Sequence, residues 1–376
     1  MTRLYRALLG TIVLLGPGAA VLGAQVAAPA VDRGYADAID SARAAVGELL
    51  ARQPIPGVSA AVAVNGELVW SEGFGYADLE QRTPVTGRSM FRIGSVSKPI
   101  TAAAVMRLVE AGRLDLDVPI QRYVPDFPEK PWPITTRQLA GHLGGIRHYR
   151  GLEFLLNRPF ATVRAGLALF ERDSLLHEPG TAYFYSSYGW NLISAVVEEA
   201  AGEAFLAHLH RAVFTPLRLL HTAPDRKDSV IPERTRFYGI RNGVAMPEPE
   251  VDNSYKWAGG GLLSTPEDLV RFASAHLAPG YLMAASLETL FTSQRTMAGE
   301  ETGYGIGWYV AKDAAGRRVV RHGGGSVGGT AMLLLYPDQG VAVAIVANVS
   351  GAEYRDVPRR IAEAFLVAAP VRTSPR

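Results

Sequence analysis

The spacing of apolar residues predicts a helix near the start of the chain and a pair of strands directly after it. Apolar positions recur with helical spacing from about residue 32 to residue 52. Two β-rich runs follow, at 59–64 and 67–70, on either side of Asn65 and Gly66. An Asn-Gly pair between two such runs is typical of a tight β-hairpin.

The rest of the chain divides into a helical middle and a β-rich end. Residues 96–111 are apolar on nearly every side of a helix, which predicts a buried helix. Residues from about 114 to 250 have helix-and-loop character with frequent prolines, and a helical pattern returns over 352–367. Four short β-rich runs lie before that last helix, at 304–310, 317–321, 330–336 and 341–346.

This order predicts an α+β fold, with one antiparallel sheet built from both ends of the chain. Helices flank the sheet, and the mostly helical region at about 114–250 is inserted between its two parts. We expect a single folded domain over 35–368, followed by a short tail at 369–376.

The N-terminus has the pattern of an export signal. Two arginines precede an apolar run at 7–23, and small residues follow it. We expect a signal peptide over 1–24, a linker over 25–34 and a mature protein in the periplasm or secreted. The alternative is an uncleaved membrane anchor. Gly-Pro-Gly at 16–18 argues against it, because a spanning helix needs about 20 uninterrupted apolar residues.

Composition limits the classes of partner. The 376 residues are 48% hydrophobic and 20% charged, with a net charge of +2, which excludes a disordered chain and gives no basic patch for nucleic acid. The absence of cysteine excludes disulfides and thiolate zinc sites. We expect a small-molecule or peptide substrate, no metal, no cofactor, no nucleic acid and no stable membrane span after cleavage. The oligomeric state stays open.

Ser95 and Lys98 are the first candidates for chemistry. Of the five lysines, only Lys98 has a serine three positions before it. The pair begins the buried apolar helix, so both side chains lie on one helical face. Burial lowers the pKa of a lysine, and a neutral lysine can remove a proton from a serine hydroxyl. The alternative is a capping serine beside a lysine that reaches solvent.

Two further segments could complete a site. Tyr185 precedes a helix predicted over 191–201, and a nearby ammonium that lowers its pKa would make it a proton shuttle. Glycines at 323–325 stand between two predicted strands, where they could let a substrate lie against a strand edge. The alternatives are core packing for Tyr185 and a plain hairpin turn for the glycines.

These three segments resemble the serine β-lactamase and penicillin-binding-protein family. In that family the motifs Ser-x-x-Lys, Tyr-x-Asn and (Lys/His)-Thr-Gly occur in this order, and the resemblance covers about 55–366. The runs 134–149 and 251–261 are similar to its mitochondrial serine β-lactamase-like branch. The resemblance implies a β-lactamase/transpeptidase-like fold and a catalytic role for the domain at 35–368.

The family implies a role for each matching position. Ser95 would be acylated, Lys98 would deprotonate it, and Tyr185 would relay protons to and from the leaving group. The backbone N–H groups of Ser95 and Gly325 would bind the oxyanion. His322 would stand where many relatives carry a lysine that contacts a substrate carboxylate.

Two positions depart from the motifs. Ser187 replaces the asparagine and Gly323 replaces the threonine, while Gly324 keeps the motif glycine beside the substrate. Both changes disfavour β-lactam hydrolysis and favour an exported serine hydrolase of amide, peptide or ester bonds. We also expect His322 to titrate between about pH 6 and 8. The competing hypothesis is a binding or scaffold protein that kept the fold and lost the reaction.

Two other sets of residues are weaker candidates. His208 and His210 are two positions apart on a predicted helix, so we expect surface residues and not ligands. Trp257 stands beside three consecutive glycines, where it could line the cleft or be buried at a turn.

Overall fold

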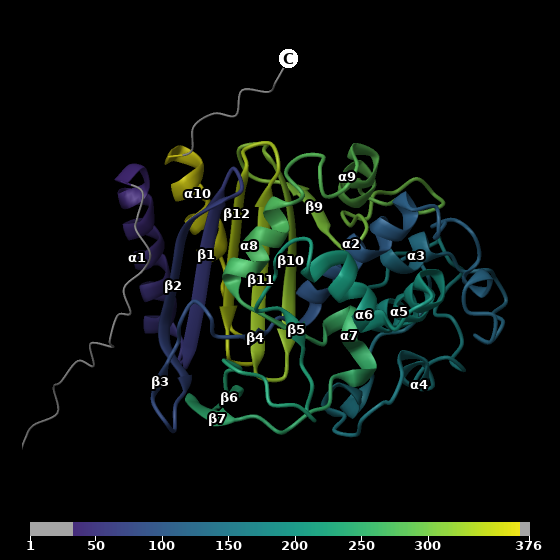
Figure 1. Cartoon of the computed structure of the whole chain (residues 1–376), viewed down its shortest axis with the longest axis horizontal. Coiled ribbons are helices and arrows are strands. Elements are labelled where there is room, and N and C mark those ends of the chain that lie inside the picture. Colours follow the sequence, from purple (N-terminus) through teal and green to yellow (C-terminus); the bar gives the residue numbers. More distant parts are fainter. Residues whose placement is uncertain (1–32, 369–376) are drawn as a thin grey trace, which may run out of the picture.

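The computed structural model describes residues 33–368 (Figure 1). The predicted signal peptide at 1–24, most of the linker and the tail at 369–376 lie outside the described residues. Within the described part of the chain, no helix is both long enough and apolar enough to cross a membrane.

A seven-stranded sheet forms the centre of the molecule, and all its strand pairs are antiparallel. The strand order is β3-β2-β1-β12-β11-β10-β9, so strands from the two ends of the chain meet at β1 and β12. The predicted α+β fold is confirmed. The strands are β1 (Gly57–Val64), β2 (Glu67–Asp78), β3 (Thr83–Pro84), β9 (Tyr309–Lys312), β10 (Arg318–Ser326), β11 (Gly329–Tyr336) and β12 (Val341–Ala347).

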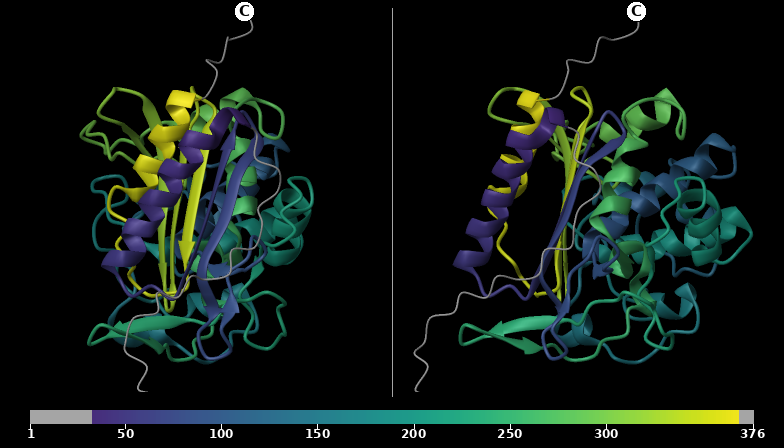
Figure 2. Two further views of the ribbon diagram at one scale, coloured as in Figure 1. Left: turned by 90° about the vertical axis from the view of Figure 1, so that its left-hand side faces the viewer. Right: turned by 60° about the vertical axis from the view of Figure 1, so that its left-hand side comes forward.

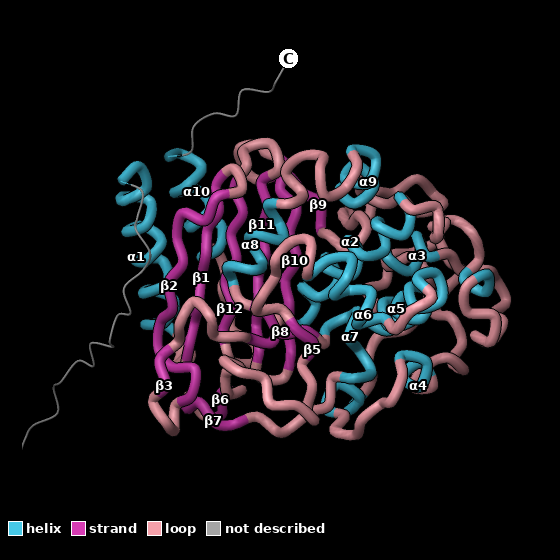
Figure 3. Tube along the Cα trace, viewed as in Figure 1, coloured by secondary structure: helices cyan, strands magenta, loops and turns pink. Residues whose placement is uncertain are grey.

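Helices cover both faces of the sheet (Figure 2). α1 and α10 pack on each other over one face, and α8 packs on the other face against β1, β2, β11 and β12. The remaining helices lie on the same side of the sheet as α8 (Figure 3). The helices are α1 (Ala36–Arg52), α2 (Ser97–Glu110), α3 (Thr136–Ala140), α4 (Val163–Leu167), α5 (Ser187–Ala201), α6 (Phe205–Leu209), α7 (Trp257–Gly260), α8 (Pro266–Ser274), α9 (Ala284–Phe291) and α10 (Val357–Ala368).

The sheet separates two hydrophobic cores, because successive side chains of a strand point to opposite faces. In β1, Ala61 and Ala63 join the core shared with α2 and α5. Val62 and Val64 join the core beneath α1 and α10. Such strands are buried on both faces and therefore read as continuous apolar runs.

The structure corrects several details of the sequence analysis. The strand expected at 304–310 is β9, which begins only at Tyr309. The helical middle also contains a two-stranded hairpin at residues 238–247, which was not predicted. His208, which was expected at the surface, is buried instead. Its Nδ1 lies 3.1 Å from a carboxylate oxygen of Glu203. The short strands outside the main sheet are β4 (Phe91–Arg92), β5 (Ala223–Pro224), β6 (Tyr238–Arg241), β7 (Val244–Pro247) and β8 (Leu262–Ser264).

Candidate active site

Ser95 lies on a tight turn between β4 and α2. β4 pairs with β8, and residues 94–96 form a 3₁₀ turn that leads directly into α2. Gly94 has φ +49°, and a Cβ there would lie 2.5 Å from the carbonyl oxygen of Gly325. Only glycine fits this position, since both the backbone conformation and the available space exclude a side chain. The turn leaves Ser95 partly exposed at the start of an otherwise buried helix.

Lys98 is fully buried and its amine has three oxygen neighbours. Nζ lies 2.9 Å from Ser95 Oγ, 2.9 Å from Ser187 Oγ and 2.6 Å from the carbonyl oxygen of Gly259. Burial holds the pKa of Lys98 well below its ordinary value, and the charge of Lys256 lowers it further. A carbonyl only accepts hydrogen bonds, whereas a serine hydroxyl donates or accepts. A neutral amine therefore donates to Gly259 and Ser187 and offers its lone pair to the Ser95 hydroxyl.

Tyr185 lies over the same amine, with its ring centroid 4.9 Å from Lys98 Nζ. Burial raises the pKa of Tyr185 well above its ordinary value, although contacts with the Ser95 and Ser187 hydroxyls oppose this. The lowering of this pKa by a nearby ammonium, which was the condition for a proton shuttle, is not found, because burial outweighs the other effects. Tyr185 therefore remains a protonated phenol, which can donate a proton but is not a standing base.

The glycines at 323–325 belong to β10, and the turn lies beyond them at Val327 and Gly328. The pairing of β10 with β9 ends at Arg321, so the edge that carries the glycines is free of β9. A Cβ on Gly324 would lie 1.9 Å from the carbonyl oxygen of Ile93, whereas a Cβ on Gly325 would meet nothing within 4 Å. The strand backbone thus lies directly against the nucleophile turn, and Gly325 faces open space.

His322 is buried beside this edge, and both of its ring nitrogens have partners. Nδ1 lies 2.7 Å from the carbonyl oxygen of Gly323, so Nδ1 carries the proton, and Nε2 accepts from the Tyr304 hydroxyl at 2.9 Å. Burial lowers the pKa of His322 to about 3. The expected titration between pH 6 and 8 is therefore wrong. His322 is neutral throughout that range.

Two histidines that the sequence analysis did not single out orient the start of α5. His142 Nδ1 accepts from the backbone N–H of Ser186, and His148 Nδ1 accepts from that of Ser187, both at 3.1 Å. These bonds satisfy N–H groups at the helix start and fix the Ser187 hydroxyl toward Lys98. The only sequence signal for them was their place in a family-like run.

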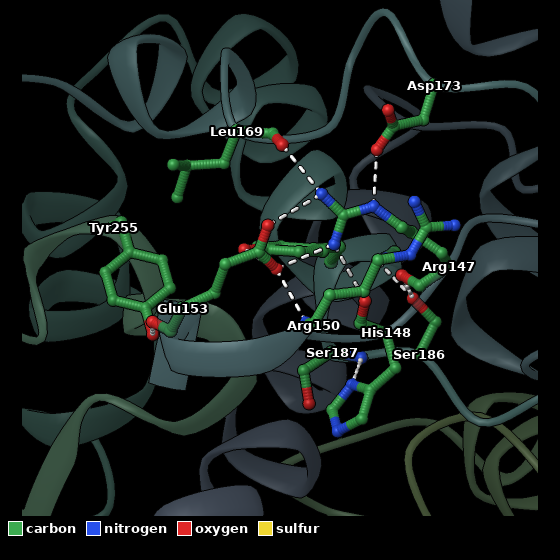
Figure 4. A network of polar contacts seen from close by, with 11 residues as sticks. Arg147, His148, Arg150, Glu153, Leu169, Asp173, Ser186, Ser187 and Tyr255 are labelled. Atoms are coloured by element: carbon green, nitrogen blue, oxygen red, sulfur yellow. Dashed lines mark hydrogen bonds and ion pairs between the residues drawn. The ribbon is translucent and has the colours of Figure 1, made fainter. Parts of the chain in front are cut away.

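A partly buried ion network, centred on the buried Arg147, holds the loop that carries His148 (Figure 4). Arg147 Nη1 and Nη2 donate to the two carboxylate oxygens of Glu153 at 2.7 and 2.9 Å, and Arg147 also pairs with Asp173. The backbone carbonyl of Arg147 accepts from the Ser186 hydroxyl at 2.7 Å. The network therefore connects the 147–153 loop to the residue next to Ser187.

Trp257 is a buried residue at the first position of α7. A Cβ on Gly261 would lie 2.8 Å from its ring. Trp257 also lines a cavity of about 710 Å³ with Phe160 and Phe205, and Ser95 is not among the residues that line this cavity. The reading of Trp257 as a buried residue at a turn agrees with this placement.

Residues 42–366 match the family described as Beta-lactamase. The chain belongs to that family. It is 31% identical to the human serine beta-lactamase-like protein LACTB, mitochondrial, over 91% of this chain and 82% of that one. The family resemblance found in the sequence is confirmed.

Solved structures agree with this family. The octameric penicillin-binding protein homologue from Pyrococcus abyssi superimposes with a TM-score of 0.76 at 26% identity, covering 88% of this chain and 78% of that one. The D-amino acid amidase from Ochrobactrum anthropi SV3, solved with D-phenylalanine, gives a TM-score of 0.76 at 23% identity, covering 88% and 99%. At 23% identity, the likeness to the amidase supports the fold alone.

Proposed function

We propose that the protein is an exported serine hydrolase that cleaves amide or ester bonds through an acyl-enzyme. The observation that carries this proposal is the placement of a buried amine 2.9 Å from the hydroxyl of a partly exposed serine. A proton-accepting role accounts for the cost of burying Lys98 there without a carboxylate among its hydrogen-bond partners.

In the proposed reaction, Lys98 takes the Ser95 proton as Oγ attacks the substrate carbonyl carbon. The N–H groups of Ser95 and Gly325 receive the oxyanion. Tyr185 donates its proton to the leaving nitrogen or oxygen as the old bond breaks, and it regains a proton from Lys98. Water then attacks the carbonyl carbon of the acyl-enzyme, and the same groups transfer protons in the reverse direction. This step releases the acid and restores Ser95.

The proposed substrates are amides and esters that need no carboxylate beside the scissile bond. His322 is neutral, and Gly323 lacks the hydroxyl that the family motif carries at this position. Replacement of the motif asparagine by Ser187 fits the same scheme, since the Ser187 hydroxyl meets Lys98.

The decisive experiment is covalent labelling with a fluorescent phosphonate, together with turnover of a panel of short acyl esters, peptide amides and a chromogenic cephalosporin. Ser95→Ala should abolish labelling and lower turnover by several orders of magnitude. Wild-type turnover in Ser95→Ala would refute the nucleophile. The scaffold hypothesis instead predicts that the wild-type protein is not labelled under any condition.

Export is tested separately from catalysis. Mass spectrometry of periplasmic or secreted protein should find a mature N-terminus between about Gln25 and Asp32. A cytosolic protein with an intact Met1 would contradict this part of the proposal and leave the acyl-enzyme mechanism untouched.

A further inference from the structure

A second lysine is buried near the candidate site, in a cage of aromatic rings. Lys256 is 2% exposed, and its Nζ lies 4.4 Å from the ring centroid of Phe154, 5.2 Å from that of Tyr255 and 5.8 Å from that of Tyr149. An ammonium is attracted to the faces of such rings, and this attraction is strongest where water is excluded. The cage therefore favours the charged form of Lys256.

The cage is connected to Lys98 by two short paths. Lys256 immediately precedes α7, whose Gly259 carbonyl accepts from the Lys98 amine at 2.6 Å. On the other side, burial raises the pKa of the Tyr149 phenol while the Ser187 hydroxyl acts to lower it, and Ser187 Oγ lies 2.9 Å from Lys98 Nζ. Two buried amines thus share one region of low dielectric constant, where like charges repel strongly.

Charged groups from several elements surround Lys256. Burial, then the charge of Arg92, lowers the pKa of Lys256 to about 7, whereas Asp225 opposes the shift. His148 and Lys98 face it from the 142–149 loop and from α2. The carboxylates of Glu153 and Asp252 act on the cage residue Tyr255. The Glu153 carboxylate, however, is bound by Arg147.

We propose that Lys256 is a positioning residue that keeps Lys98 in its neutral, proton-accepting form. The two amines hold one proton between them, and the three-ring cage retains it on Lys256. A proton on Lys256 makes a second proton on Lys98 costly, so Lys98 has a free lone pair toward Ser95. This inference rests on the proposed acyl-enzyme mechanism.

The test is the rate of Ser95 labelling by a fluorophosphonate as a function of pH. The rate should rise with pH as Lys98 loses its proton. Lys256→Met removes the repelling charge, which raises the pKa of Lys98, so the rising limb should move to higher pH. On that limb the rate should fall about tenfold, while the high-pH plateau stays unchanged. Lys256→Arg keeps the charge and should keep the limb at or below its wild-type position.

Lys227→Met is the matched control, because it removes the same charge from an exposed lysine that pairs with Glu250. Its limb should coincide with that of the wild type. An unmoved limb in Lys256→Met, or an equal loss of plateau in the Met and Arg variants, would overturn this inference and leave the proposed function standing. No labelling of the wild type at any pH would instead overturn the proposed function. If Lys256→Met lowers the melting temperature, Lys256→Gln provides the same comparison.

Discussion

At the scale of single residues, Ser187 is one of the three groups that hold the Lys98 amine in place. We expect Ser187→Ala to lower kcat/KM about tenfold, because a hydrogen bond to such an amine contributes roughly 1–2 kcal/mol. Ser187→Asn restores the amide of the family motif and should retain most of the activity. Steady-state kinetics of the two variants provide the comparison, and full activity in Ser187→Ala would contradict this role.

The neutral state of His322 gives a prediction for pH. Its pKa of about 3 lies below its unfolded value, so the ring does not change charge between pH 6 and 8. A peptide with a free carboxylate and its neutral amide should therefore show parallel profiles of kcat/KM over this range. His322→Lys introduces a cation and should favour the carboxylate substrate. Profiles that diverge in the wild type would mean that His322 is charged when substrate binds.

At the scale of elements, the contact between β10 and the nucleophile turn depends on the missing side chain of Gly324. Gly324→Ala places a Cβ 1.9 Å from the carbonyl oxygen of Ile93, so the strand must shift away from Ser95. We expect loss of phosphonate labelling and a lower melting temperature. Gly325→Ala meets open space and should fold normally, with KM raised where the methyl group enters the cleft. Equal melting temperatures for the two variants would contradict this geometry.

Local patterns predicted some elements and missed others for physical reasons. The Asn65-Gly66 hairpin was predicted correctly because its turn chemistry is local, and Asn65 has the required positive φ of 51°. The strand character of the glycines in β10 depends on pairing with β11, which the local sequence does not report. His148 and Lys256 gave no signal beyond their place in family-like runs, because each acts through partners far away in the chain. The pairing of Ser95 with Lys98 was predictable because three residues of helix connect them.

At the scale of the whole molecule, the sheet separates the site from the core beneath α1 and α10. Phe365 on α10 is fully buried in that core. Phe365→Ala should cost about 3–5 kcal/mol of stability and lower the melting temperature by several degrees. The kcat of the folded protein should not change, since no group at the site moves. Val367→Ala, at a position on the same helix that is 89% exposed, is the control and should have little effect. A loss of kcat in Phe365→Ala below its melting temperature would show that the two cores are coupled.

The pairing of β1 with β12, with Val58 opposite Ala347, has a consequence for synthesis. A ribosome releases β1 long before its partner strand β12, because the two strands are far apart in the chain. Until then the sheet lacks its central pair, and α1 lacks α10 and the completed sheet face on which it packs. The nascent chain therefore cannot complete its native core until β12 has emerged. Contacts this far apart in sequence also make folding slow, which lengthens the time in which a chaperone can hold the chain unfolded.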